Sequence, residues 1–165
     1  MKKRAVFVWI AAAVFAADRL TKVLANSLLI GQGSRKVIPY LLELRYSQNQ
    51  GMALGLFSGN NLATLILPLL AVVGWFFVFR KHRPTWFTVV ATALVSGGFA
   101  GNFVDRLFWG YVVDMVYFPF LPWFICNVAD VGICLGVGML ALSLFLRPQD
   151  WREQCAEEDR DSERA

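Results

Sequence analysis

The sequence predicts an all-α membrane protein with four transmembrane helices, and two observations lead to this fold class. Of the 165 residues, 57% are apolar and only 17% are charged, whereas a soluble domain carries about 25% charged residues. The apolar residues also occur in long uncharged blocks. A helix needs about 20 predominantly apolar residues to cross a bilayer core of about 30 Å. We also expect a small extended, β-like segment on the outer surface and an interfacial segment before the fourth helix.

Four blocks have the length of a membrane span, and the middle two contain no charged residue. They cover approximately residues 5–24, 62–79, 86–104 and 123–146. The first block follows three basic residues, as the apolar part of a cleavable signal peptide does. We expect it to be retained, because three more spans follow and because the block stays apolar beyond Asp18 as far as Leu24. Residues 1–146 are therefore predicted to form one membrane domain.

Basic residues lie at the ends of the predicted spans and indicate their orientation. They are Lys2, Lys3 and Arg4, then Arg80, Lys81 and Arg83, and finally Arg147 and Arg152. Because short loops rich in Lys and Arg stay in the cytoplasm, we expect both termini there and residues 25–61 and 105–122 on the outer face. Residues 147–165 contain four Arg and seven acidic residues and are predicted to form a charged cytoplasmic tail.

The two outer segments differ in composition. The first contains several glycines, and its stretch 37–46 is β-prone and of mixed polarity, which is typical of a small extended structure. The second follows Asp105 and is rich in aromatic residues. Because aromatic residues favour the headgroup layer of a membrane, we expect this second segment to lie along the interface before the fourth span.

The charge pattern and the cysteine and histidine content exclude several functions. The basic residues form short groups between apolar blocks, so nucleic-acid binding is not expected. Cys126, Cys134 and Cys155 have neither a metal-binding spacing nor a disulfide framework. The single histidine, His82, lies in a basic cluster that we place in the cytoplasm. We expect no metal and no cofactor, so any catalysis depends on carboxylates.

Several polar residues fall at the outer ends of the predicted spans, where ionisable groups are costly. Asp18 and Lys22 are spaced as a helical ion pair, which fits either a scaffold or a site. Asn102, Asp105 and Arg106 fit either a local hydrogen-bonded cluster or a functional site. The glycines before them, Gly97, Gly98 and Gly101, allow close packing of helices.

Asp114 and Asp130 have no basic residue at helical spacing. Two such carboxylates brought together share a proton, and one ionised and one neutral carboxyl can activate a water and protonate an amide leaving group. The residues alone leave two alternatives open, an ion or proton pathway and a metal-bound phosphoryl-transfer site. A pathway requires polar residues through both leaflets, whereas the cytoplasmic halves of these spans are apolar.

Five short motifs occur in order between residues 5 and 146. They are Asp18-x-x-Thr21-Lys22, Asn49-x-Gly51-x-Ala53, Gly97-Gly98-x-x-Gly101-Asn102-x-x-Asp105-Arg106, Val112-x-Asp114 and Asn127-x-Ala129-Asp130. Together they resemble the motifs of the bacterial lipoprotein signal peptidases (signal peptidase II), a family of four-span membrane aspartyl proteases. Three positions depart from the family pattern, which usually has aromatic residues there: Leu54, Met115 and Cys126.

The resemblance implies a reaction and a set of site residues. The reaction is hydrolysis of the peptide bond just before a diacylglyceryl-modified cysteine in a prolipoprotein, with Asp114 and Asp130 as the catalytic pair. The residues implied to bind substrate or support the site are Asn49, Gly98, Asn102, Arg106, Asn127, Asp105, Asp18 and Lys22. We expect a monomer in the bacterial inner membrane that contacts membrane lipids and whose active site lies near the outer, periplasmic face.

Overall fold

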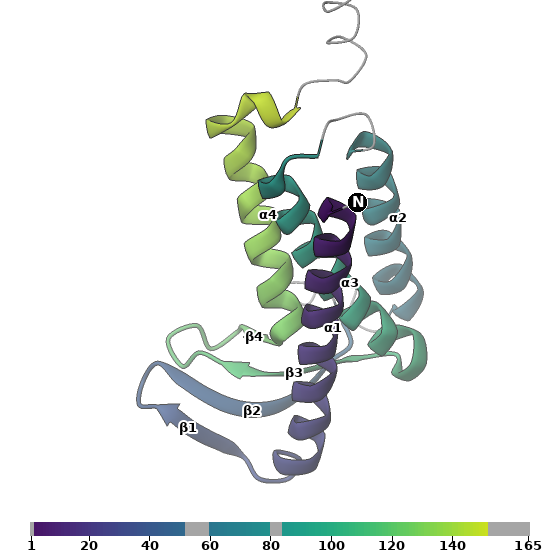
Figure 1. Ribbon diagram of the computed structural model, residues 1–165. Coiled ribbons are helices and arrows are strands. Elements are labelled where there is room, and N and C mark those ends of the chain that lie inside the picture. The colour runs from purple at the N-terminus through teal and green to yellow at the C-terminus, as the bar shows by residue number, and fades with distance from the viewer. Residues whose placement is uncertain (1, 52–59, 80–83, 152–165) are drawn as a thin grey trace, which may run out of the picture.

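The computed structural model describes residues 2–51, 60–79 and 84–151, which form helices and one small sheet (Figure 1). The helices are α1 (Lys2–Leu28), α2 (Asn61–Phe79), α3 (Trp86–Trp109) and α4 (Val128–Leu146), followed by the short 3-10 helix η2 (Pro148–Trp151). The strands are β1 (Ser34–Ile38), β2 (Leu42–Asn49), β3 (Val112–Tyr117) and β4 (Ile125–Cys126). The chain is thus mostly helical, as the sequence predicts.

Within the described ranges, two helices are long and apolar enough to cross a membrane, α3 and α4. A shorter apolar run, Leu62–Phe77, lies in α2. The longest helix, α1, carries Asp18, Arg19 and Lys22 in its second half. These charged residues of α1 contact Asp105 of α3 and the backbone of Ala129 in α4.

Small residues allow α3 to pack closely against both α1 and α4. A Cβ atom on Gly98 would collide with the carbonyl oxygen of Ala129 in α4, and one on Gly97 would collide with the backbone of Ala11 in α1. Helices whose backbones approach this closely require small residues at the contact. This packing places the first turn of α4 directly beside α3.

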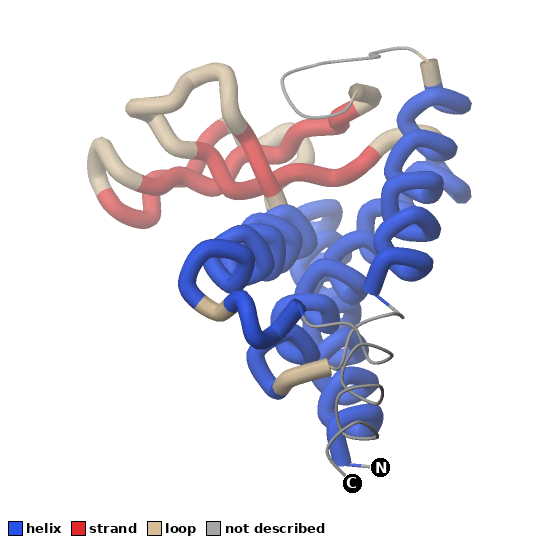
Figure 2. Tube along the Cα trace, turned by 90° about the horizontal axis from the view of Figure 1, so that it is seen from above, coloured by secondary structure: helices blue, strands red, loops and turns tan. Residues whose placement is uncertain are grey.

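The four strands form one antiparallel sheet in the order β1-β2-β3-β4. The sheet lies at the end of α1 that is away from the N-terminus (Figure 1), and it extends beyond the helices to one side (Figure 2). A small apolar cluster of Ala25, Leu29, Val113 and Met115 joins α1 to β3. The expected extended segment is therefore two strands of a larger sheet.

The boundaries of α3 and α4 differ from the sequence-based ones for local reasons. Helix α3 continues past residue 104 to Trp109, where Gly110 ends it in the left-handed conformation with φ 73°. Helix α4 begins at Val128 because Asn127 caps it, and the two residues before the cap pair with β3. Part of the expected interfacial segment, residues 112–117, is strand β3.

Candidate active site

Asp114 and Asp130 come from different elements and meet at one asparagine. Asp114 lies on β3, and Asp130 lies in the first turn of α4. The Nδ2 of Asn127 donates to Oδ1 of Asp114 at 2.7 Å, and the backbone N–H of Asn127 donates to Oδ2 of Asp130 at 3.2 Å. The helix cap thus also holds the two carboxylates beside each other.

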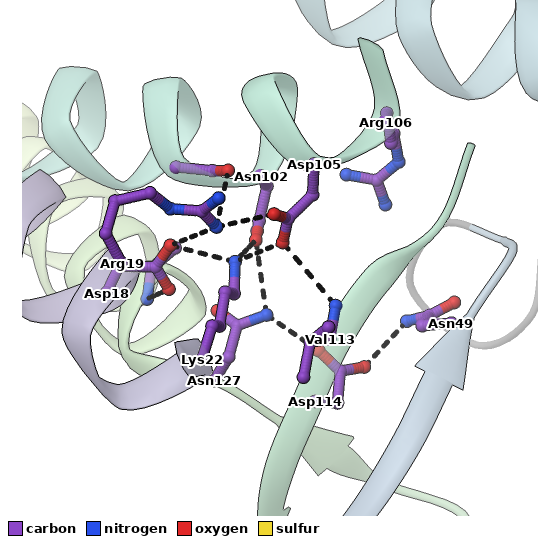
Figure 3. A network of polar contacts seen from close by, with 12 residues as sticks. Asp18, Arg19, Lys22, Asn49, Asn102, Asp105, Arg106, Val113, Asp114 and Asn127 are labelled. Atoms are coloured by element: carbon purple, nitrogen blue, oxygen red, sulfur yellow. Dashed lines mark hydrogen bonds and ion pairs between the residues drawn. The ribbon is translucent and has the colours of Figure 1, made fainter. Parts of the chain in front are cut away.

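Two further asparagines complete the hydrogen bonding of the pair. Asn102 of α3 donates through Nδ2 to Oδ1 of Asp130 at 2.7 Å. Asn49 at the end of β2 donates through Nδ2 to Oδ2 of Asp114 at 3.0 Å (Figure 3). Each of the four carboxyl oxygens therefore accepts a hydrogen bond from a neutral N–H group.

Asp114 is only 2% exposed. Burial raises the pKa of Asp114 to about 7, and the charge of the neighbouring Asp130 adds to this rise. Hydrogen bonds from Asn49 and Asn127 and the charge of Lys22 oppose the shift. Near neutral pH the Asp114 carboxyl can therefore exist in either protonation state, which suits a group that takes or gives a proton.

A four-ion cluster lies beside the pair, formed by Asp18, Arg19, Lys22 and Asp105 (Figure 3). The Nζ of Lys22 lies 2.8 Å from Asp18 and 2.8 Å from Asp105. The Nη2 of Arg19 lies 3.2 Å from Asp18 and 2.5 Å from Asp105. The helical pair expected from the spacing of Asp18 and Lys22 is present, within a larger network.

Asn102 connects this cluster to the carboxyl pair. Its Oδ1 accepts hydrogen bonds from Nζ of Lys22 at 2.9 Å and from Nδ2 of Asn127 at 3.2 Å. Its Nδ2 is the donor to Asp130. Because the ammonium group of Lys22 can only donate, it fixes which end of the Asn102 amide faces Asp130.

Arg106 and Gly98, two further residues expected at the site, occupy different places. The Nη2 of Arg106 donates to the carbonyl oxygen of Gly51 at 2.9 Å, so it holds the chain just after β2. Gly98 faces the backbone of Ala129 at the α3–α4 contact. Gly98 therefore lies in the contact between α3 and α4, beside the residue that precedes Asp130.

Two of the three positions that depart from the motifs are described, and each follows or precedes a residue of the site in the chain. Met115 is buried in the cluster between α1 and β3, and Cys126 is buried on β4. Burial raises the pKa of the Cys126 thiol to about 12. Leu54, His82 and Cys155 lie outside the described residues.

Sequence reasoning did not single out Arg19. Its signal was available, because an arginine within an apolar block of membrane-spanning length is an unusual ionisable residue. Its main partner, Asp105, lies 86 positions further along the chain, so helical spacing could not identify the contact. Among the described residues no group of three or more His, Cys, Asp or Glu side chains could hold a metal ion.

The fold and the site are those of a small, mostly helical membrane enzyme, in which a buried carboxyl pair lies where apolar helices meet a sheet. The family model for signal peptidase (SPase) II matches residues 10–146. The chain belongs to the signal peptidase II family and is a protease.

Individual relatives agree with this family. The chain is 33% identical to a lipoprotein signal peptidase of Streptococcus pneumoniae, over 88% of this chain and 95% of the relative. It is 35% identical to a lipoprotein signal peptidase of Desulfitobacterium hafniense, over 85% of this chain and 93% of the relative. A solved bacterial membrane enzyme superposes with a TM-score of 0.78 at 28% identity, over 91% of this chain and 93% of that one.

Proposed function

We propose that this protein is an aspartic endopeptidase that cleaves the signal peptide from diacylglyceryl-modified prolipoproteins, just before the lipidated cysteine. The observation that carries the proposal is the pairing of Asp114 and Asp130 across Asn127. The relatives named above, which are lipoprotein signal peptidases, support the choice of substrate.

The pair performs acid–base catalysis on the peptide bond. The ionised carboxylate takes a proton from a water molecule, whose oxygen attacks the carbonyl carbon ahead of the lipidated cysteine. The neutral carboxyl gives its proton to the departing amide nitrogen when the carbon–nitrogen bond breaks. Two carboxylates that share one proton supply both functions at the same pH. The surrounding asparagines hold the two groups in place without adding a charge.

The substrate also determines where the active site must lie relative to the membrane. A signal helix in the bilayer and a diacylglyceryl group in the outer leaflet place the scissile bond at the outer edge of the membrane. We place the protein in the bacterial inner membrane with α1 to α4 as four spans, both termini in the cytoplasm and the sheet on the outer face. Large apolar side chains on the exposed surface of α4, among them Leu135, Leu142 and Phe145, suit contact with lipid. We assign a monomer.

The supporting residues divide into two groups. Asn49, Asn102 and Asn127 orient the carboxyl pair, since each donates to Asp114 or Asp130. Arg106 anchors the chain after β2 through the carbonyl oxygen of Gly51. The ions of the cluster and Gly98 hold the helices that carry the pair.

The test is cleavage of a synthetic prolipoprotein by the purified protein in detergent, with a lipidated and an unlipidated copy compared by mass spectrometry. We expect one cut, before the lipidated cysteine, and at least about a hundredfold slower cleavage of the unlipidated copy, since substrate binding energy is then lost. Equal cleavage of both copies would contradict the proposed substrate.

The same assay tests the pair. Asp114→Asn and Asp130→Asn each keep the size of the side chain but remove the proton that catalysis moves, so each should lower kcat by about a thousandfold or more. The double variant should be no worse than either single variant, because the two groups act as one unit. Near-normal cleavage by either single variant would overturn the aspartic mechanism.

A further inference from the structure

Each supporting carboxylate holds the backbone directly before one member of the pair. Oδ1 of Asp18 accepts a hydrogen bond from the backbone N–H of Ala129 at 3.0 Å, one residue before Asp130. Oδ2 of Asp105 accepts a long hydrogen bond from the backbone N–H of Val113 at 3.5 Å, one residue before Asp114 (Figure 3). The separation of Asp18 and Asp105 is thereby linked to the separation of the two proposed catalytic groups.

Two cations set that separation, because each of them contacts both supporting carboxylates. Lys22 is one of them, and Arg19 is the other. Asp18 and Asp105 are 0% and 2% exposed, and two buried negative charges need two positive charges for neutrality. With only one cation, the repulsion between the two buried carboxylates is not fully compensated.

We propose that Arg19 is a positioning residue for the reaction, which fixes the distance between Asp114 and Asp130 by bridging Asp18 and Asp105. The proposal rests on the proposed function of that pair. Without Arg19, Asp105 moves away from Asp18, and β3 shifts relative to the first turn of α4. Misplacement of reacting groups by about 1 Å costs on the order of a hundredfold in rate.

Arg19 can be tested separately from the rest of the site. Lys22 also contacts Asn102, so its removal disturbs the pair by a second route. The contacts of Arg19 go to Asp18, Asp105 and the carbonyl oxygen of Gly101, all through Nη2, and its guanidinium lies 5.9 Å from the ring of Trp109. Because a single nitrogen makes the polar contacts, a lysine ammonium can replace them in part.

The experiment compares Arg19→Met and Arg19→Lys in the lipidated-substrate assay, with rates normalised to folded protein. We expect Arg19→Met to lower kcat by about ten- to a hundredfold with KM unchanged, and Arg19→Lys to recover most of the loss. The matched control is Lys3→Met, which removes a cation of the same helix that donates to Pro84 and lies 5.8 Å from the ring of Trp86. It should leave kcat per folded protein unchanged.

Three results would overturn the proposal: wild-type kcat in Arg19→Met, an effect confined to KM, or a loss that disappears on normalisation to folded protein. If Arg19→Met does not fold, Arg19→Gln takes its place, since it keeps an N–H donor without the charge. A fully active Asp114→Asn would instead overturn the proposed function. An inactive Asp114→Asn with wild-type kcat in Arg19→Met would overturn only the role of Arg19.

Discussion

At the scale of single residues, the site contains two kinds of buried carboxylate that differ in their partners. Asp18 and Asp105 each contact two cations. Asp114 and Asp130 accept hydrogen bonds from asparagine N–H groups. This difference in partners distinguishes Asp18 and Asp105 from the proposed catalytic pair.

The raised pKa of Asp114 predicts a pH-dependent stability. The folded state holds this proton up to about pH 7, whereas an unfolded chain releases it near pH 3.9. Stability therefore falls as pH rises through this window. Asp114→Asn removes the titration, so its thermal midpoint in detergent should fall less than that of the wild type between pH 4 and pH 8. For a chain of this size, each kcal/mol by which the free energy of unfolding changes shifts the thermal midpoint by about 2–4 °C.

If the thermal midpoints of the two proteins changed by the same amount between pH 4 and pH 8, this would contradict a raised pKa of the buried Asp114. Asn127 is not a suitable control because it donates to this carboxyl. Glu43 is better, since it lies on β2 and its side chain pairs with the exposed Ser34. Glu43→Gln should leave the difference between pH 4 and pH 8 unchanged.

A second prediction concerns the thiols. Cys126 is buried, and its raised pKa keeps it neutral at physiological pH, so it is a poor nucleophile and a poor metal ligand. Replacing Cys126, Cys134 and Cys155 together by alanine should leave kcat within about threefold of the wild type, because none of the three thiols is expected to take part in the reaction.

Activity should also survive the removal of metal ions with EDTA. Loss with EDTA that zinc or magnesium restores would favour a metal-dependent mechanism.

At the scale of the elements, the sequence was informative where a motif lay on one helix and less so where partners came from distant segments. The apolar block of the fourth span predicts helix α4, although the predicted span begins at residue 123 and the helix begins only after its cap, Asn127. Strand β3 is harder to recognise, because residues 112–115 are all buried and so show no alternation of polar and apolar residues. The sheet contacts that place Asp114 opposite Ser47 involve distant segments, and no local pattern reports them.

The α3–α4 contact gives a third prediction. A methyl group on Gly98 collides with the backbone of Ala129, next to Asp130. Gly98→Ala should cost about 1–3 kcal/mol in stability and lower activity per folded protein. Gly138→Ala in α4 is the control, because a Cβ there meets nothing within 4 Å. Equal activity and equal thermal midpoints in the two variants would mean that neither stability nor activity depends on the close approach of α3 and α4.

At the scale of the whole molecule, the described polar network lies at one end of the helices, beside the sheet. The N-terminal end of α1 lies at the opposite end of the helices (Figure 1). Large apolar side chains remain exposed along the helices, among them Trp9, Leu70, Phe76 and Leu135. An exposed apolar belt with polar groups at one end matches a protein surrounded by lipid. With the four helices in the bilayer as proposed, we expect the site at one membrane surface.

The orientation of the whole molecule is the last prediction. The three basic clusters predict that both termini are cytoplasmic, and the sheet at the far end of α1 is then expected on the outer face. In a variant without native cysteines, Ser34→Cys on the exposed strand β1 should react with a membrane-impermeant maleimide added to intact cells or spheroplasts. His82→Cys should react only after the membrane is opened. The reverse pattern would put the sheet in the cytoplasm, away from the outer leaflet that holds the lipid of the substrate. That result would overturn the proposed orientation of the helices and the sheet.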